Sequence, residues 1–135
     1  MFIDDAKFDQ KLYQRIAERS GVVDETLSFL YADEALEYLK NNPNKHIDII
    51  FLDINMPRMN GFEFLEAASR DLREGFARLL VVMLTTSLER SDRDRALSHP
   101  IVHGFINKPL TVDILHNLAT LLFAPSDALP VPGWR

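Results

Sequence analysis

The amino-acid sequence predicts an α/β fold: five βα units, written (βα)5, that form a doubly wound, five-stranded parallel sheet. Apolar runs alternate along the chain with amphipathic helical stretches, a pattern typical of parallel strands joined by right-handed crossovers. Two of the runs, 47–52 and 79–84, are apolar almost throughout, as strands are when helices cover both faces of a sheet. The length of 135 residues, 47% of them hydrophobic, suits one domain with a buried core.

The first βα unit begins at the N-terminus. The short apolar segment 1–3 is expected to be a strand, and the segment 7–20 a helix that ends at Gly21. Apolar side chains recur in this helix at the i, i+4, i+8 spacing of a single inward face. They are Phe8, Leu12 and Ile16.

The second unit has an alternating strand followed by a helix. Residues 26–31 alternate in hydropathy, which predicts a strand. Asp33 is expected to cap the next helix, because its side-chain oxygen can accept from a free backbone N–H of the first turn. A turn over 41–44 follows this helix. The inward-facing residues of the helix are Ala35, Leu36 and Leu39.

The remaining three units repeat the same order. Their strands are expected over 47–52, 79–84 and 101–107, and their helices over 62–73, over 88–98 and after Thr111. Pro109 ends the last strand, since it has no N–H to continue the ladder, and Thr111 caps the final helix. The helix over 88–98 is polar and therefore expected to be exposed. Apolar anchors in the three helices are Phe62, Leu65, Leu72, Ala96, Leu97, Leu115, Leu118 and Leu122.

Polar side chains follow four of the five predicted strands, at the point where each strand ends. Asp4 and Asp5 follow the first strand, Asp53 the third, Thr85 the fourth and Lys108 the fifth. Ligands of such sheets bind at the carboxyl ends of the strands. One Asp after a strand is more often a turn or cap residue, but four such positions in one small domain predict a functional site.

The three carboxylates indicate a divalent cation. Like charges at close range repel one another, and a hard cation relieves this repulsion. Magnesium prefers carboxylate and carbonyl oxygens and also accepts phosphate oxygens. Zinc is disfavoured, because no His or Cys follows these strands. The sequence therefore favours a magnesium site over a zinc site.

The same residues suit phosphoryl transfer to Asp53. A carboxylate can act as a covalent nucleophile, and the transition state spreads charge over three phosphoryl oxygens. Lys108 and the Thr85 hydroxyl would each bind one of these oxygens. Capture of the phosphoryl group by Thr85 would draw its loop inward, and Phe105 could move into the vacated space, so the chain would be a two-state switch. The alternative for Phe105 is a static core aromatic.

Four segments of the sequence resemble the receiver domain of bacterial two-component response regulators, and most of all a stand-alone, chemotaxis-type receiver. The resemblance covers residues 1 to about 123. The matching segments are Phe2-Ile3-Asp4-Asp5, the stretch from Phe51 to Gly61, Val82-Met83-Leu84-Thr85-Thr86-Ser87, and the stretch from Gly104 to Leu110.

The resemblance implies the flavodoxin-like receiver fold with strand order 2-1-3-4-5, and it assigns the site. Asp53 would be the phosphoacceptor. Asp5, Asp53 and the main-chain carbonyl of Asn55 would hold Mg²⁺, with help from Asp4. Thr85 and Lys108 would bind the phosphoryl group, with Thr85 and Phe105 as the switch. A cis Lys108–Pro109 bond is also implied.

The resemblance further implies partners and activity. The phosphodonor would be a sensor histidine kinase or a phosphotransfer protein. The face made by the fourth helix, the last strand and the last helix would bind an unknown downstream protein. Such a chain is a signalling phosphoacceptor in a phosphorelay rather than an enzyme, with Mg²⁺-dependent autophosphorylation and autodephosphorylation. It would be cytoplasmic, and a monomer or weak dimer.

The sequence departs from the family pattern in several places. Only three residues precede Asp4, where the family has a longer first strand, so this strand is either truncated or frayed. Ala6 follows the acidic pair where another polar residue is common. Asn55 and Ser87 stand at positions that tune the lifetime of the aspartyl phosphate in this family, so the resemblance does not imply a lifetime for this chain. The proline-rich tail 124–135 is expected to be a linker or end segment without an output domain. Because of Trp134, a docking peptide is the alternative for this tail.

Composition excludes some classes of protein. The net charge of −5 disfavours a nucleic-acid surface, which needs a basic patch, and the absence of Cys excludes disulfides and thiolate metal sites. No apolar run is long enough for a membrane helix, which needs about 18 residues or more.

Three alternative functions make different demands on the sequence. An aspartyl phosphatase or phosphotransferase would need a second carboxylate two residues after the nucleophile, where Asn55 stands and cannot transfer protons. A flavin-binding domain would need a Ser/Thr/Gly-rich phosphate loop after the first strand, where residues 4–9 would repel a phosphate unless a metal intervened. A degenerate receiver used only as a phosphorylation-independent scaffold is disfavoured by the intact set of Asp5, Asp53, Thr85 and Lys108.

Overall fold

The computed structural model describes residues 1–72 and 79–123, and in them five parallel strands form one sheet in the order β2-β1-β3-β4-β5. This confirms the predicted fold class and strand order. The strands are β1 (Phe2–Ile3), β2 (Ser28–Phe29), β3 (Ile49–Leu52), β4 (Leu80–Thr85) and β5 (Val102–Asn107). The helices are α1 (Lys7–Ser20), α2 (Ala32–Asn41), α3 (Gly61–Asp71), α5 (Arg90–Leu97) and α6 (Val112–Phe123).

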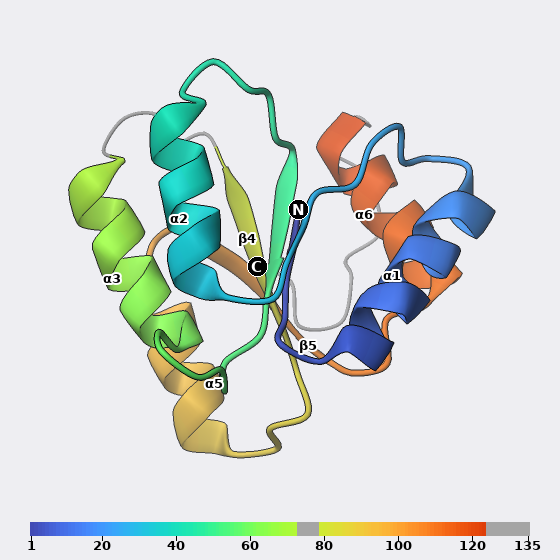
Figure 1. Cartoon of the computed structure of the whole chain (residues 1–135). Coiled ribbons are helices and arrows are strands. Elements are labelled where there is room, and N and C mark those ends of the chain that lie inside the picture. The colour runs from blue at the N-terminus through green and yellow to red at the C-terminus, as the bar shows by residue number, and fades with distance from the viewer. Residues whose placement is uncertain (73–78, 124–135) are drawn as a thin grey trace.

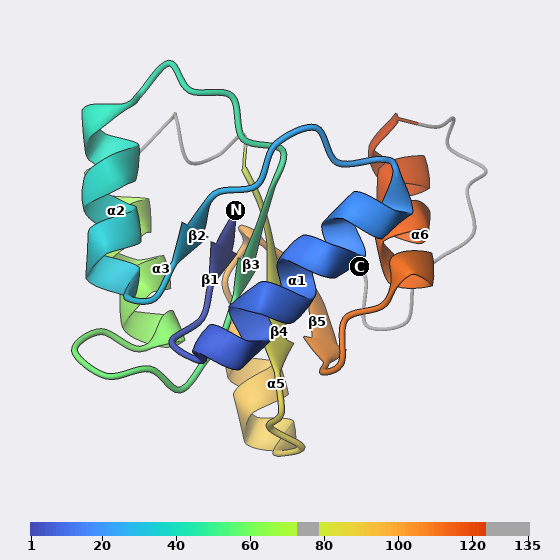
Figure 2. The same ribbon diagram turned by 45° about the vertical axis from the view of Figure 1, so that its right-hand side comes forward.

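Helices cover both faces of the sheet (Figure 1). Helices α1 and α6 lie against one face, and α2, α3 and α5 lie on the other. In Figure 2, α1 crosses in front of the strands, so the sheet is enclosed between the two helical layers. The doubly wound arrangement therefore leaves the carboxyl ends of the strands as the open edge of the sheet.

The core is divided by the sheet into two apolar clusters. Along β4, Val81 and Met83 belong to the cluster under α2, α3 and α5, whereas Val82 and Leu84 belong to the cluster under α1 and α6. All four side chains are at most 1% exposed. Successive strand residues point to opposite faces, which explains why this sequence is apolar without alternation.

The predicted inward face of α1 was wrong in one respect. Phe8 is 73% exposed, and Leu12 and Ile16 are only partly buried. The buried face of the helix is Gln10, Tyr13, Ala17 and Ser20. The apolar stripe is thus rotated from the true contact face, which is set by how α1 packs against the sheet and not by the apolar periodicity.

The predicted cap of α2 was also wrong. The helix begins at Ala32 with Tyr31 at the N-cap position, and no side chain caps it. Asp33 instead lies inside the first turn, where its Oδ2 accepts from the Arg58 guanidinium at 2.5 Å. By contrast, the predicted Thr111 cap is confirmed, since Ile114 N donates to its Oγ1 at 3.2 Å.

Four of the strands are shorter than the predicted runs, whereas β4 has six residues, as many as the run 79–84. The second strand covers Ser28–Phe29 only, within the predicted 26–31.

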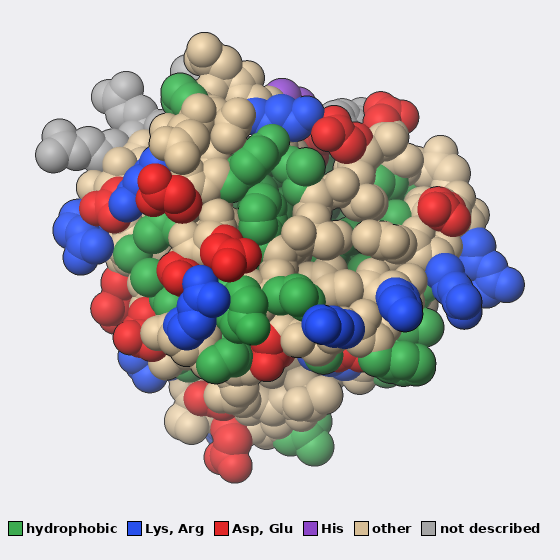
Figure 3. Space-filling model, viewed as in Figure 1, with side chains coloured by type: hydrophobic (Ala, Val, Ile, Leu, Met, Phe, Trp, Pro, Cys, Tyr) green, Lys and Arg blue, Asp and Glu red, His purple; other side chains and the backbone are tan. Residues whose placement is uncertain are grey.

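Residue 73 of the third predicted helix and the tail 124–135 with Trp134 lie outside the described residues. Within the described parts of the chain, no helix is both long and apolar enough to cross a membrane. The face in Figure 3 carries acidic and basic side chains interspersed.

Gly61 is required by the close approach of α3 to the end of β3. Its backbone N–H donates to the Ile54 carbonyl at 2.8 Å, and a Cβ at this position would lie 2.4 Å from the Asp53 carbonyl oxygen. Only backbone movement could relieve that contact. We expect Gly61→Ala to lower the free energy of unfolding by about 1–3 kcal/mol in urea denaturation.

The matched control is Ser69→Ala, at an exposed position of the same helix. It should change stability by less than about 0.5 kcal/mol. Equal stability of Gly61→Ala and Ser69→Ala would contradict the steric account of Gly61.

Candidate functional site

The predicted strand-end residues meet at the carboxyl edge of the sheet. Asp4 and Asp5 follow β1 and Asp53 follows β3, and one carboxylate oxygen of each lies within 4.8 Å of the others. Asp4 and Asp53 are buried, at 2% and 8% exposure, whereas Asp5 is exposed. Of these three carboxylates, Asp5 is therefore the one that is exposed to solvent.

Lys108 bridges this acidic group from the end of β5. Its Nζ lies 2.8 Å from Asp4 Oδ2, 2.9 Å from Asp9 Oδ2 and 3.6 Å from Asp53 Oδ2. The Lys108 backbone N–H donates to the Thr85 carbonyl at 2.8 Å, and the Lys108–Pro109 peptide bond is cis, as the resemblance implies. The side chain is 13% exposed, so its charge is only partly screened by water.

The ionisation of Asp53 reflects its crowded surroundings. Burial, together with the negative charge of Asp4, raises the pKa of Asp53 to about 6, although Lys108 and the Ile54 N–H favour the charged form. Burial also disfavours the charged form of Lys108, but hydrogen bonds to Asp4 and Asp9 raise the pKa of Lys108 above its ordinary value. The site therefore holds an excess of negative charge that Lys108 only partly balances.

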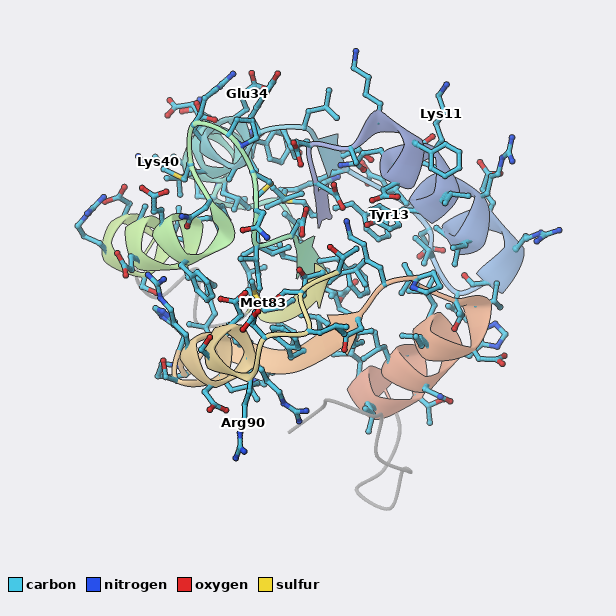
Figure 4. The ribbon with its side chains drawn as sticks, turned by 90° about the horizontal axis from the view of Figure 1, so that it is seen from below. Lys11, Tyr13, Glu34, Lys40, Met83 and Arg90 are labelled. Carbon is cyan, nitrogen blue, oxygen red and sulfur yellow. The ribbon has the colours of Figure 1, made fainter. Side chains whose placement is uncertain are left out.

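Helix α1 supports the site with polar side chains that sequence reasoning missed. Tyr13 Oη donates to Asp4 Oδ2 at 2.7 Å, and its ring stacks on Phe2 at a centroid distance of 4.9 Å. Burial and this hydrogen bond raise the pKa of Tyr13, so the phenol remains a donor. Figure 4, which looks onto this edge, shows Tyr13 pointing from α1 toward the strands and Lys11 pointing away.

Gln10 joins the two shortest strands. Its Nε2 donates to the Asp4 and Phe29 carbonyls at 3.0 Å each and lies 3.3 Å from the Phe2 carbonyl. These contacts supplement a β1–β2 pairing of only two residues on each strand. Gln10 and Tyr13 are spaced i, i+3 and so share one helix face, but they do not belong to the apolar stripe by which a buried face is predicted.

We expect Gln10→Ala to lower the free energy of unfolding by about 1–3 kcal/mol, because buried carbonyls lose their donor. Gln14→Ala, at an exposed position of the same helix, is the matched control and should be nearly neutral. Both variants can be compared by urea denaturation. A Gln10→Ala variant as stable as Gln14→Ala would exclude this bridging role.

Thr85 and Ser87 organise the loop between β4 and α5. Thr85 is fully buried at the end of β4, and its Oγ1 accepts from Ser87 N at 3.1 Å. Ser87 Oγ donates to Asp92 Oδ2 at 2.7 Å, while the Ser87 carbonyl accepts from Asn107 Nδ2 at 2.7 Å. The loop therefore links β4, α5 and β5.

Phe105 and Asn55 are the remaining residues predicted for the site. Phe105 is 6% exposed on β5, pairs in register with Met83, and lines a 580 Å³ groove beside α5. Asn55 is exposed in the loop after Asp53.

Arg58 lies in the same loop, with φ 70°. Its guanidinium stacks over the Tyr31 ring at 4.0 Å and pairs with Asp33, which ties the loop to α2.

The donor set fits a hard divalent cation. Asp4, Asp5 and Asp53 offer oxygen ligands only, and no nitrogen or sulfur ligand belongs to this group in the part of the chain that the structure describes. Burial and, after it, the negative charge of Asp4 raise the pKa of Asp53, so a further positive charge at the site would favour its ionised form. A magnesium ion would supply that charge and accept phosphate oxygens.

Comparisons with known proteins agree with this geometry. Residues 1–120 match the family model described as the response regulator receiver domain. The chain is 29% identical over 118 residues to the autoinducer 1 sensor kinase/phosphatase LuxN of Vibrio campbellii; this match covers 87% of the chain but only 13% of LuxN.

Two solved structures are similar over nearly their whole length. A two component response regulator from Cytophaga hutchinsonii superposes with a TM-score of 0.83 at 28% identity, covering 90% of this chain and 92% of that one. The Borrelia burgdorferi CheX-CheY-BeF3-Mg²⁺ complex gives a TM-score of 0.74 at 26% identity, covering 92% and 87%. With its sheet order, its strand-end acidic group and its matched segment taken together, the chain belongs to the response regulator receiver domain family.

Proposed function

We propose that the chain is a phosphoacceptor of a two-component phosphorelay, with Asp53 as the phosphorylated residue. The observation that supports this most is the meeting of Asp53 with two further carboxylates and Lys108 at the sheet edge. Asp53 is anchored at Oδ1 by the Ile54 N–H at 2.9 Å, which leaves Oδ2 turned toward Lys108. One oxygen is held and the other is available to react.

The proposed reaction is attack by an ionised Asp53 oxygen on the phosphorus of a phosphodonor. A new O–P bond forms, the bond from phosphorus to the donor's leaving group breaks, and the leaving group departs with the electron pair. Lys108 and the Thr85 hydroxyl stabilise charge on two phosphoryl oxygens. Mg²⁺, held by Asp5, Asp53 and the Asn55 carbonyl with Asp4 nearby, would supply charge to a third.

The phosphodonor in this proposal is a sensor histidine kinase or a phosphotransfer protein. The relative LuxN, named as a sensor kinase/phosphatase, and the CheY structure in complex with CheX support this class of partner. That CheY complex also contains Mg²⁺ and BeF3, which supports magnesium as the ion for this chain. The chain would also transfer phosphoryl groups from small phosphodonors and hydrolyse its own acyl phosphate.

Readout is proposed to occur on the face formed by α5, β5 and α6. Phosphorylation would draw Thr85 toward Asp53, and the Ser87 contacts with Asp92 and Asn107 would carry this movement to α5 and β5. Phe105 borders the groove beside α5, so a change in its packing would reshape that surface. A downstream protein would then bind one state better than the other.

Incubation with phosphoramidate and Mg²⁺, followed by intact mass measurement, tests the proposal. We expect wild type to gain one phosphoryl group, and expect no gain with EDTA or in the Asp53→Ala variant. Absence of an adduct on wild type, or an adduct that persists in Asp53→Ala, would refute the proposed function.

The Lys108→Ala variant tests whether Lys108 is needed for the conformational change on phosphorylation and not for metal binding. We expect the variant still to bind Mg²⁺, because its carboxylates remain, but not to change the backbone NMR signals of the β4–α5 loop on phosphorylation. Signal changes equal to those of wild type would show that Lys108 has no part in the switch.

A further inference from the structure

Asp9 is a fourth carboxylate at the site, and it contacts Lys108 rather than the acidic group. It lies in the first turn of α1, 99 positions before Lys108, and its Oδ2 is 2.9 Å from Lys108 Nζ. Its side chain is 27% exposed, against 13% for Lys108. Asp9 is not in the group of three carboxylates that could share a cation among the described residues. Its visible contact is therefore with the lysine.

The distances from Nζ show which carboxylates the Lys108 ammonium group contacts. Asp4 at 2.8 Å and Asp9 at 2.9 Å are within hydrogen-bond range, whereas Asp53 at 3.6 Å is outside it. The ammonium donates a hydrogen bond to Asp9 and forms an ion pair with Asp4, so its nearest partners both lie away from the phosphoacceptor. In the resting protein, Lys108 is held toward β1 and α1.

We propose that Asp9 is a positioning residue that retains Lys108 in this resting place and competes with the phosphoryl group for it. The inference rests on the proposed function, because it concerns the same reaction at Asp53. Asp4 would be drawn partly toward a metal once one is bound, and Asp9 would then remain as the carboxylate that holds Lys108. Lys108 must leave Asp9, at least in part, to stabilise the phosphoryl oxygens. Asp9 therefore slows phosphorylation.

The test is a double-mutant cycle on the phosphorylation rate. Initial rates with phosphoramidate at saturating Mg²⁺ are measured by intact mass for wild type, Asp9→Asn, Lys108→Ala and the double variant. We expect Asp9→Asn to react roughly threefold to fivefold faster than wild type, the range for releasing one partly exposed ion pair. In the Lys108→Ala background, followed over a longer time course, Asp9→Asn should have no effect.

The cycle distinguishes action through Lys108 from a general charge effect. Glu18→Gln removes the same charge from an exposed position of α1 and should leave the rate unchanged. An Asp9→Asn rate equal to that of wild type, or an acceleration that persists without Lys108, would overturn the inference while the proposed function stands. A wild type that gains no phosphoryl group would overturn both.

Discussion

Lys108→Ala should lower the free energy of unfolding of the metal-free protein by about 2–4 kcal/mol at neutral pH. Lys108 Nζ contacts Asp4 and Asp9 and lies near Asp53, so its removal leaves buried negative charge without a counterion. Asp4 is only 2% exposed and cannot recover its hydration. The measurement is urea denaturation in EDTA, monitored by circular dichroism.

The same experiment with Mg²⁺ supplies the control for charge. A divalent cation among the carboxylates replaces much of the lost positive charge, so the destabilisation should shrink when Mg²⁺ is present. Lys11→Ala, on the exposed face of α1, should be nearly neutral in both buffers. A Lys108→Ala loss of the same size with and without Mg²⁺ would show that packing, rather than charge, accounts for the effect.

Asp53→Asn should stabilise the metal-free protein by about 1–3 kcal/mol at pH 8. The pKa of Asp53 is raised from its ordinary 3.8 to about 6, so the folded state binds this proton more tightly than the unfolded chain does. The side chain therefore favours folding below about pH 4, and this contribution is lost as the pH rises through 6. Above pH 6, ionised Asp53 opposes folding, and Asn avoids that penalty.

Denaturation at pH 4, 6 and 8 in EDTA would follow this dependence. The advantage of Asp53→Asn should be largest at pH 8 and disappear toward pH 4. Added Mg²⁺ should stabilise wild type more than the variant, since the variant lacks one ligand. Asp24→Asn, in an exposed loop, is the control for removal of one charge. A variant no more stable than wild type at pH 8 would contradict the raised pKa.

The central sheet could be predicted because its strands are buried on both faces. Runs such as 79–84 have few alternatives to a covered parallel strand, and β4 lies over Leu80–Thr85. Amphipathic helices were harder to orient. Phe8 fits an apolar stripe with Leu12 and Ile16, yet burial is decided by where α1 meets the sheet, which local periodicity does not contain.

The strand-end part of the site could also be predicted, since parallel topology brings the carboxyl ends of distant strands together. Asp53 and Lys108 were found in this way, and the structure places their side chains 3.6 Å apart. The contribution of α1 to the site could not be predicted from the sequence. Gln10 and Tyr13 face the strand ends only because the helix packs at one particular angle, and their hydrogen bonds depend on that tertiary arrangement.

The most direct measurement for the central claim locates the phosphoryl group on the chain. After reaction with phosphoramidate and Mg²⁺, borohydride reduces an aspartyl phosphate to homoserine, and peptide mass mapping then identifies the altered residue. The account predicts conversion at position 53 and at no other Asp. Conversion at Asp4, Asp5 or Asp9, or a phosphoryl group on a residue other than Asp, would contradict it.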